Sequence, residues 1–145
     1  MFNGIIFNKG IVNKIKKSTK GVNIFVKSNL KVKNKDLGVS ICCDGVCLTM
    51  VSLKNKVMEF YLLKETMNRS KFKNISIGDK INLELPLKYG QKISGHLCQG
   101  HVDCTSKVNK IIKKGNSRIY DFTIDKNNLS YLIPKASILL NGVSL

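Results

Sequence analysis

The chain has 145 residues and a mass of 16.2 kDa, which suits one ordinary domain or two small ones. Hydrophobic residues make up 43% of it and charged residues 23%, values that exclude disorder throughout. No apolar run is long enough to cross a membrane. The short apolar start at Met1–Lys9 lacks the basic region that precedes a secretory signal. We therefore expect a cytoplasmic protein with no membrane partner.

The formal net charge of +16 would suit a nucleic-acid partner, but its makeup argues against one. Lysine supplies 23 of the 25 basic residues, and 15 asparagines accompany them. An excess of Lys, Asn and Ile is typical of AT-rich genomes, whereas proteins that read phosphates and bases favour arginine. We expect no nucleic-acid partner. The alternative, a basic nucleic-acid-binding barrel, requires aromatic side chains on a strand face beside the lysines.

Short segments rich in Val, Ile, Phe and Tyr predict strands at Val22–Lys27, Val39–Cys43, Val46–Ser52, Val57–Leu62 and Arg118–Ile124. Good helix formers predict a short helix over Leu63–Ser70, and Leu129–Leu132 is a second candidate. Leu85–Leu87, Gly90 and Gly95 indicate a connector. Short strands separated by Gly, Asn, Asp and Ser predict an all-β fold built on a small closed barrel.

The dipeptide Asp44-Gly45 predicts a two-residue hairpin turn, because both residues tolerate a positive φ. Asn141-Gly142 predicts a second such turn. A two-residue loop fixes the register of the first hairpin. The predicted pairs are Cys43 with Val46, Cys42 with Cys47, Ile41 with Leu48, and Ser40 with Thr49.

Cross-strand partners share a face, so this register separates two faces. One is apolar and predicts core: Val39, Ile41, Cys43, Val46, Leu48 and Met50. The other carries small hydroxyl and thiol groups: Ser40, Cys42, Cys47 and Thr49. A solvated outer face is the simple alternative, but such a face would carry lysine in this composition and neither hairpin has one there. We interpret it as a ligand face.

The chain also repeats itself in order. Gly4 and Val12–Ile15 match Gly100 and Val108–Ile111 at an offset of 96, and Ser40–Leu48 matches Ser137–Leu145 at an offset of 97. This pattern indicates one complete unit of about 96 residues followed by half of another. The stretch from Thr49 to about Gly95 has no second copy, which indicates a fragment or a truncated gene.

Both histidines and two of the five cysteines lie in one segment, Ser94–Cys104. A zinc site is one interpretation, but the chain has no CxxC knuckle, and a structural histidine is another. The odd cysteine number favours reduced thiols. His101 stands where the first unit has Ile5. Histidine moves protons near neutral pH, so this difference is typical of a protein in which only one of two repeated units carries the catalytic group.

The chain resembles the riboflavin synthase family along nearly its whole length. The segments that carry the resemblance are MFNGII from Met1, GVCLT from Gly45, KET from Lys64, the GD-IN-E pattern from Gly78, GHLCQGHVD from Gly95 and NGVSL at the end. The resemblance implies two six-stranded Greek-key barrels per subunit, a homotrimer, and no metal or organic cofactor. Each barrel would bind one 6,7-dimethyl-8-ribityllumazine. Dismutation of two such molecules would give riboflavin and 5-amino-6-ribitylaminouracil. Residues 1–96 would form the first lumazine-binding barrel and 97–145 part of the second.

The resemblance also implies site residues. Substrate contacts would come from Phe2, Gly4, Ile5, Ile6, Cys47, Leu48, Thr49, Tyr61, Leu62, Leu63, Lys64, Glu65, Thr66, His96, Gly100, His101, Val102, Lys135 and Ser144. By this resemblance, Phe2 to Ile6 would line the ligand pocket of the first barrel, and Gly100 to Val102 would line that of the second. His101 is the candidate for proton transfer, and Cys47 is a candidate nucleophile or orienting group, a role that Ser40 or water could also serve.

The chain departs from the family by ending at Leu145, inside the second barrel. We therefore expect it to bind ligand without turnover when it acts alone. The alternative is a non-catalytic lumazine- or flavin-binding protein of the same superfamily, which would have no need of His96 and His101.

Overall fold

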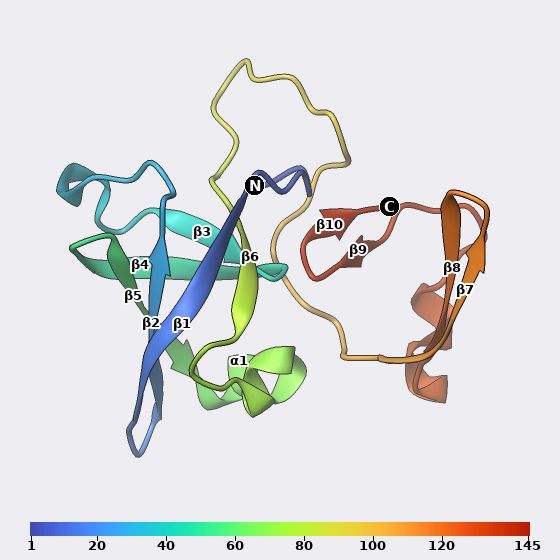
Figure 1. Cartoon of the computed structure of the whole chain (residues 1–145), viewed down its shortest axis with the longest axis horizontal. Coiled ribbons are helices and arrows are strands. Elements are labelled where there is room, and N and C mark those ends of the chain that lie inside the picture. The colour runs from blue at the N-terminus through green and yellow to red at the C-terminus, as the bar shows by residue number, and fades with distance from the viewer. The chain divides into compact units, whose positions relative to one another are not determined.

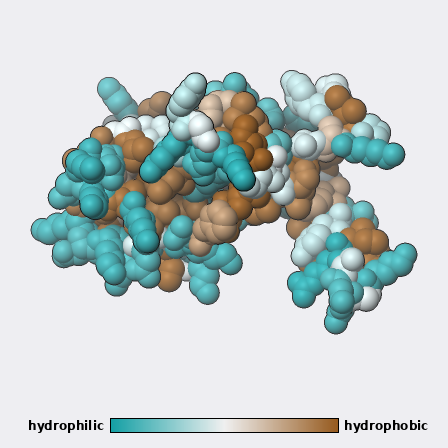
Figure 2. Space-filling view, turned by 90° about the horizontal axis from the view of Figure 1, so that it is seen from above, coloured by the Kyte–Doolittle hydropathy of each residue, from teal (hydrophilic) through white to brown (hydrophobic).

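The computed structural model describes all 145 residues and divides them into two compact units (Figure 1). The first unit contains residues 1–102 together with 137–145, and the second contains residues 103–136. None of the helices has the length and apolar character needed to span a membrane. Hydrophilic side chains project over much of the visible surface, and hydrophobic residues are exposed among them (Figure 2).

The first unit is built on a closed antiparallel barrel with the strand order β1-β2-β5-β4-β3-β6. Its strands are β1 (Asn8–Lys17), β2 (Gly21–Ser28), β3 (Ser40–Cys43), β4 (Val46–Lys54), β5 (Val57–Leu63) and β6 (Lys80–Glu84). Between them lie the 3-10 helix η1 (Asn34–Asp36), the helix α1 (Lys64–Arg69) and the 3-10 helix η2 (Lys71–Asn74). The all-β fold and the closed barrel predicted from the sequence are confirmed.

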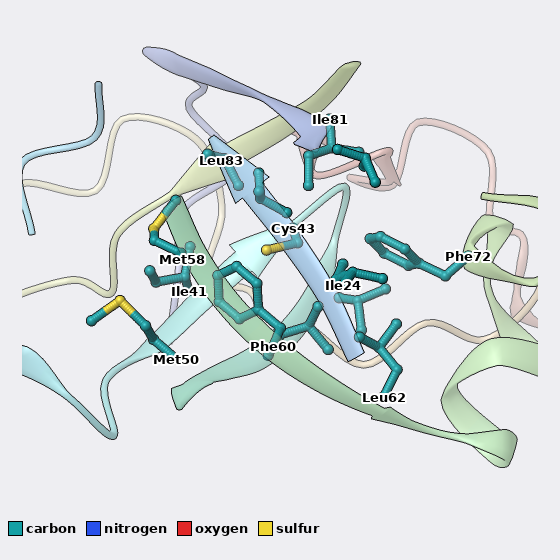
Figure 3. Packing of buried hydrophobic residues seen from close by; sticks show 14 of the residues in the cluster. Ile24, Ile41, Cys43, Met50, Met58, Phe60, Leu62, Phe72, Ile81 and Leu83 are labelled. Carbon is teal, nitrogen blue, oxygen red and sulfur yellow. The ribbon is translucent and has the colours of Figure 1, made fainter. Parts of the chain in front are cut away.

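Alternate residues of each strand point into the barrel and form one core. Phe60, Ile24 and Ile41 have no exposed surface, and Phe72 from η2 packs against the same cluster (Figure 3). A β-bulge at Asn13 shifts the register between β1 and β2, because Val12 pairs with Val26 whereas the next paired residue is Lys14. Such a bulge bends a strand and helps a small sheet to close.

The first hairpin has the predicted register from Cys43 opposite Val46 to Ser40 opposite Thr49. Its turn residues have φ values of 47° at Asp44 and 89° at Gly45, as the two-residue turn requires. The carboxylate of Asp44 makes two further contacts. Its Oδ1 accepts a hydrogen bond of 2.8 Å from the Asn82 backbone N–H, and its Oδ2 forms an ion pair with Lys71 Nζ at 2.7 Å.

A second, shorter hairpin belongs to the same unit. It consists of β9 (Leu139–Leu140) and β10 (Val143–Ser144), and its turn residues Asn141 and Gly142 have φ values of 49° and 79°. The two turns meet tip to tip, because a Cβ atom added to Gly142 would lie 2.8 Å from the backbone nitrogen of Gly45. The contact is between backbones and leaves no room for a side chain.

The second unit is a hairpin of β7 (Lys107–Lys114) and β8 (Ser117–Thr123) followed by the 3-10 helix η3 (Lys126–Tyr131). Its register shifts at Asn109, at the offset of 96 from the bulge at Asn13. The repeat is therefore visible in backbone geometry. The structure has one closed barrel, and the residues after it form two separate two-stranded sheets rather than a second barrel.

The five strands predicted from apolar content are all found within two residues of their expected ends, and α1 matches the predicted helix. Strands β1, β6 and β7 were not singled out. Lysine and asparagine occupy many positions of β1 and β7, and a bulge interrupts their alternation, so their composition is not typical of strands. β6 is only five residues long.

The contact between hairpin tips generates the first prediction. Gly142→Ala should displace β9–β10 from the barrel and speed hydrogen exchange at the Ser144 amide on the order of tenfold, because the added methyl group meets Gly45. Gly115→Ala is the control: Gly115 also has a positive φ, of 60°, but nothing lies within 4 Å of its Cβ position. Equal exchange at Ser144 in both variants would contradict the contact.

Candidate functional site

Two glycine segments each lie against the hairpin of the other repeat. The carbonyl of Gly100 accepts a hydrogen bond of 2.8 Å from the Cys47 N–H, and the carbonyl of Gly4 accepts one of 2.8 Å from the Ser144 N–H. Gly4 corresponds to Gly100, and Cys47 to Ser144, by the offsets of the repeat. Each repeat therefore makes the same contact with the other repeat. We call this pair of contacts the crossing.

Phe2 and Cys98 lie at the centre of the crossing. Each donates its backbone N–H to the carbonyl of the other, at 2.8 and 2.9 Å. Their side chains are buried with Cys42, and Cys47 and Leu139 pack against this cluster. The polar face predicted on the first hairpin is therefore covered by protein at its Cys42 end and is accessible towards Ser40 and Thr49.

Both glycines are required at these positions. Gly4 and Gly100 have φ values of 74° and 81°, in the region that glycine adopts readily. A Cβ atom on Gly4 would lie 2.7 Å from the Cβ of Ser144, and one on Gly100 would lie 2.7 Å from the Cβ of Cys47. The backbones can approach this closely only without side chains.

Glu84, at the end of β6, anchors the N-terminal segment. Its Oε1 accepts a hydrogen bond of 2.8 Å from the Asn3 N–H, and its Oε2 accepts one of 3.0 Å from the Gly4 N–H. The side chain is buried. Our sequence analysis noted Glu84 only as part of a family pattern and missed this role. The signal was an acidic residue at the end of a short segment whose alternate residues, Ile81 and Leu83, are apolar.

The crossing brings residues 100–102 beside the unpaired part of β4, and we call the place where β4 and β5 no longer pair the opening. β4 and β5 pair from Lys54–Val57 as far as Met50–Phe60 and then separate. Val102 packs against the core cluster that contains Leu48 of β4 and Leu62 of β5. Three of the predicted segments, Cys47–Thr49, Gly100–Val102 and Tyr61–Thr66, therefore each have a residue in or against this core cluster, and the first two are also joined by the hydrogen bond from Cys47 to Gly100.

The opening offers hydrogen-bonding groups of several kinds. Residues of an antiparallel strand point their backbone groups alternately towards and away from the neighbouring strand. Because the N–H of Cys47 points to Gly100, the backbone groups of Thr49 also point away from β3, towards the opening. Thr49 is exposed, Ser40 opposite it is half-buried, and the exposed His101 follows Gly100.

Three buried thiols near the crossing are poor nucleophiles. Burial, and secondarily the negative charge of Glu84, raises the pKa of Cys42 to about 12. The same two causes raise the pKa of Cys98, and burial raises that of Cys43 well above its usual value. These thiols stay protonated at neutral pH and react slowly. Cys47 is the one half-buried cysteine of the hairpin.

The remaining predicted residues lie at other places. His96 Nδ1 lies 2.8 Å from the Ser144 hydroxyl, beside the second hairpin. Gly4, predicted in the first pocket, lies against this second hairpin as well, and Ile5 and Ile6 follow it. Lys135 is exposed and belongs to the second unit. In the same unit, burial and the negative charges of Asp103 and Asp125 raise the pKa of Cys104.

On β5 and the turn after it, Tyr61 and Leu63 are exposed and alternate with the buried Leu62, and Lys64 and Glu65 begin α1 as exposed residues. Thr66 is half-buried. No three His, Cys, Asp or Glu side chains are grouped so that they could hold a metal ion.

A cavity of about 610 Å³ lies outside the opening. N-terminal residues, including Ile5 and Phe7, line it together with the end of β6 and the connector from Leu85 to Gln91. None of the hairpin residues Ser40, Cys47 and Thr49 is among its lining residues. Cavity size alone therefore does not identify the predicted ligand face.

Comparison with known proteins gives a family match. The model of the lumazine binding domain matches residues 3–86. The riboflavin synthase of Bacillus subtilis is 31% identical over the whole chain, which covers 67% of that protein, and the riboflavin synthase of Brucella abortus is 32% identical, with 74% of it covered.

Solved structures agree with the fold. LumP in complex with 6,7-dimethyl-8-(1'-D-ribityl) lumazine superposes with a TM-score of 0.81 at 23% identity, over 100% of this chain and 78% of LumP. LumP in complex with riboflavin gives a TM-score of 0.84 at 23% identity, over 99% of this chain and 78% of LumP. At this identity the likeness establishes the fold.

The burial of the thiols generates the second prediction. On treatment of the folded protein with iodoacetamide at pH 8, Cys47 should be alkylated before Cys42, Cys43 and Cys98, because those three are buried and have raised pKa values. Mass spectrometry of peptides measures the order. All four should react alike in guanidinium chloride, and equal rates for Cys42 and Cys47 in the folded protein would contradict the assignment.

Proposed function

Because this chain belongs to the riboflavin synthase family of lumazine-binding proteins, we propose that it binds 6,7-dimethyl-8-ribityllumazine at the opening between β4 and β5. The observation that carries the proposal is the hydrogen bond between Gly100 and Cys47, which brings residues 100–102 beside the polar end of the first hairpin. Three segments that the family resemblance assigns to the substrate then border one opening.

The chemistry of the opening suits this ligand. The dioxopyrimidine edge of lumazine presents a ring N–H between two carbonyl groups, and a free strand edge presents backbone donors and acceptors that can pair with it. Thr49 supplies such an edge, with its hydroxyl beside it. The ribityl hydroxyls can bond to side chains such as Ser40. Leu48 and Leu62 close the inner side with apolar surface.

For the reaction we propose the dismutation of two lumazines to riboflavin and 5-amino-6-ribitylaminouracil. One lumazine loses a proton from its C7 methyl group, since the carbanion delocalises into the ring, and the other accepts a nucleophile at a ring carbon; a four-carbon unit then passes between them. In this proposal His101 moves the proton, and Cys47 or Ser40 orients the acceptor. Holding the two rings in register supplies much of the rate.

The second lumazine would lie against the second repeat, which carries Ser144 in the place of Cys47 and faces Gly4. In this proposal residues 1–96 and 97–145 correspond to a first lumazine barrel and to part of a second. The matching bulges at Asn13 and Asn109 support that correspondence. Homotrimer formation would bring the first barrel of one subunit against the second barrel of a neighbour.

A second candidate function is lumazine or flavin binding without catalysis. The fold that the chain shares with LumP, solved with lumazine and with riboflavin, is in keeping with it.

Binding generates the third prediction. Thr49→Val should weaken lumazine binding about fivefold, since loss of one hydrogen bond costs about 1 kcal/mol. Titration of ligand fluorescence measures the dissociation constant. Thr19→Val, at an exposed threonine in the turn between β1 and β2, is the matched control and should leave binding unchanged. Absence of saturable binding by the folded chain would refute the proposal.

Catalysis generates the fourth prediction. In a fusion that continues this chain with the unmatched part of Bacillus subtilis riboflavin synthase, His101→Ala should slow the formation of riboflavin from lumazine, with little change in lumazine affinity, because a proton-transfer group acts mainly in the transition state. Riboflavin absorbance measures turnover. Lumazine binding with no riboflavin from the fusion that keeps His101 would favour the non-catalytic candidate.

A further inference from the structure

Two cysteines stand directly opposite each other in the first hairpin. Cys42 of β3 and Cys47 of β4 are cross-strand partners, in the pair next to the one that flanks the turn. The N–H of Cys47 donates to Gly100 and not to β3, which is typical of a pair whose members share no backbone hydrogen bond. In such a pair the Cα atoms are about 4.5 Å apart and both side chains lie on the same face. A disulfide joins Cα atoms that are about 4.4 to 6.8 Å apart, so the backbone already suits one.

The two thiols have the same neighbours but differ in their access to solvent. Cys42 is 2% exposed and is buried with Phe2 and Cys98, and Cys47 packs against the same cluster. Cys47 is half-buried and lies in the part of β4 that borders the opening. An oxidant from solvent therefore meets Cys47 first, with the thiol of Cys42 behind it. An accessible thiol beside a second thiol that can resolve it is typical of redox-sensing sites.

The other cysteines are poorer partners for such a bond. Cys43 follows in the same strand, but it belongs to the barrel core on the opposite face and has no exposed surface. The thiol of Cys98 is already engaged, because it donates a hydrogen bond of 2.8 Å to the carbonyl of His96. Cys104 belongs to the second unit.

We infer that Cys42 and Cys47 form a site of reversible oxidation, at which a peroxide converts the two thiols into a cross-strand disulfide. Hydrogen peroxide first oxidises the Cys47 thiol to a sulfenic acid and is reduced to water. The sulfur of Cys42 then attacks the sulfenic sulfur: the S–S bond forms, the S–O bond breaks, and the hydroxyl leaves as water with the proton from Cys42. In sum, two thiols and one hydrogen peroxide give one disulfide and two water molecules.

The second step is the slower one. Burial, and secondarily the negative charge of Glu84, raises the pKa of Cys42 to about 12, so its thiolate is scarce at neutral pH. The sulfenic acid at Cys47 should therefore accumulate before the disulfide forms. A bond across so short a span is strained, and strained disulfides are readily reduced by other thiols.

The disulfide would change the chemistry of the hairpin without undoing its contacts. The hydrogen bond from Cys47 to Gly100 uses the backbone N–H and would be kept. The thiol of Cys47 would be consumed, and with it a group that the proposed reaction uses to orient the acceptor. This consequence rests on the proposed function, whereas the disulfide itself does not.

The experiment treats the reduced 145-residue chain with hydrogen peroxide and then alkylates the remaining thiols with iodoacetamide in guanidinium chloride. Trypsin should release residues 36–54 as one peptide, which contains Cys42, Cys43 and Cys47. Mass spectrometry should show this peptide with one alkyl group and two hydrogen atoms fewer, and dithiothreitol should restore all three alkylation sites. Dimedone added with the peroxide should trap the sulfenic acid at Cys47 and prevent the disulfide.

Two variants identify the partner. Cys42→Ala should lower the yield of the disulfide at least about tenfold and leave Cys47 as sulfenic acid, because no resolving thiol remains. Cys43→Ala is the matched control, since it removes the neighbouring thiol of the same peptide from the core face, and it should leave the disulfide in place. Electron-transfer fragmentation of the peptide from the unaltered protein identifies the bonded pair even where a variant does not fold.

Three results would overturn the inference. The first is a disulfide that persists in Cys42→Ala, and the second is one that joins Cys47 to Cys98. The third is conversion of Cys47 to a sulfinic acid in the unaltered protein with no disulfide formed. The measurement uses no ligand, so a failure of lumazine binding would leave its outcome unchanged.

Discussion

The backbone hydrogen bond from Cys47 to Gly100, together with its repeat from Ser144 to Gly4, is the interaction on which the first unit depends. It ties each glycine segment to the hairpin of the other repeat and so holds residues 137–145 on the barrel. The bond exists only because the glycines let two backbones approach within van der Waals distance. Glu84 and the Phe2–Cys98 pair fix the N-terminal segment that the second of these bonds requires.

The crossing also explains why the barrel can be closed and yet accessible. β4 leaves β5 beyond Met50, which frees a strand edge that would normally be paired. Residues 100–102 take part of that edge: the Gly100 carbonyl satisfies Cys47 and Val102 seals the core. Thr49 is left beside them with its backbone groups towards the opening. The proposed lumazine site lies where β4 and β5 are no longer paired, since free backbone groups there can serve a ligand.

The sequence predicted the register of the first hairpin correctly, and with it the separation of a core face from a polar face. Asp44-Gly45 determines that register locally, so no distant residue was needed. The sequence also indicated the repeat, which reappears in the bulges at Asn13 and Asn109. It did not indicate that half of the polar face is covered, because Cys42 is buried by Phe2 and Cys98, which approach from other parts of the chain.

Local chemistry therefore determined the strands of apolar composition, the turns, the repeat and the identity of candidate residues such as Thr49 and His101. Tertiary structure alone decided which repeat each glycine segment serves: Gly100 lies at the first hairpin and Gly4 at the second. The physical reason is that the crossing is made by backbone hydrogen bonds between residues far apart in the chain. Such bonds use groups that every residue carries, so the sequence records the glycine that permits the contact and not the partner that it meets.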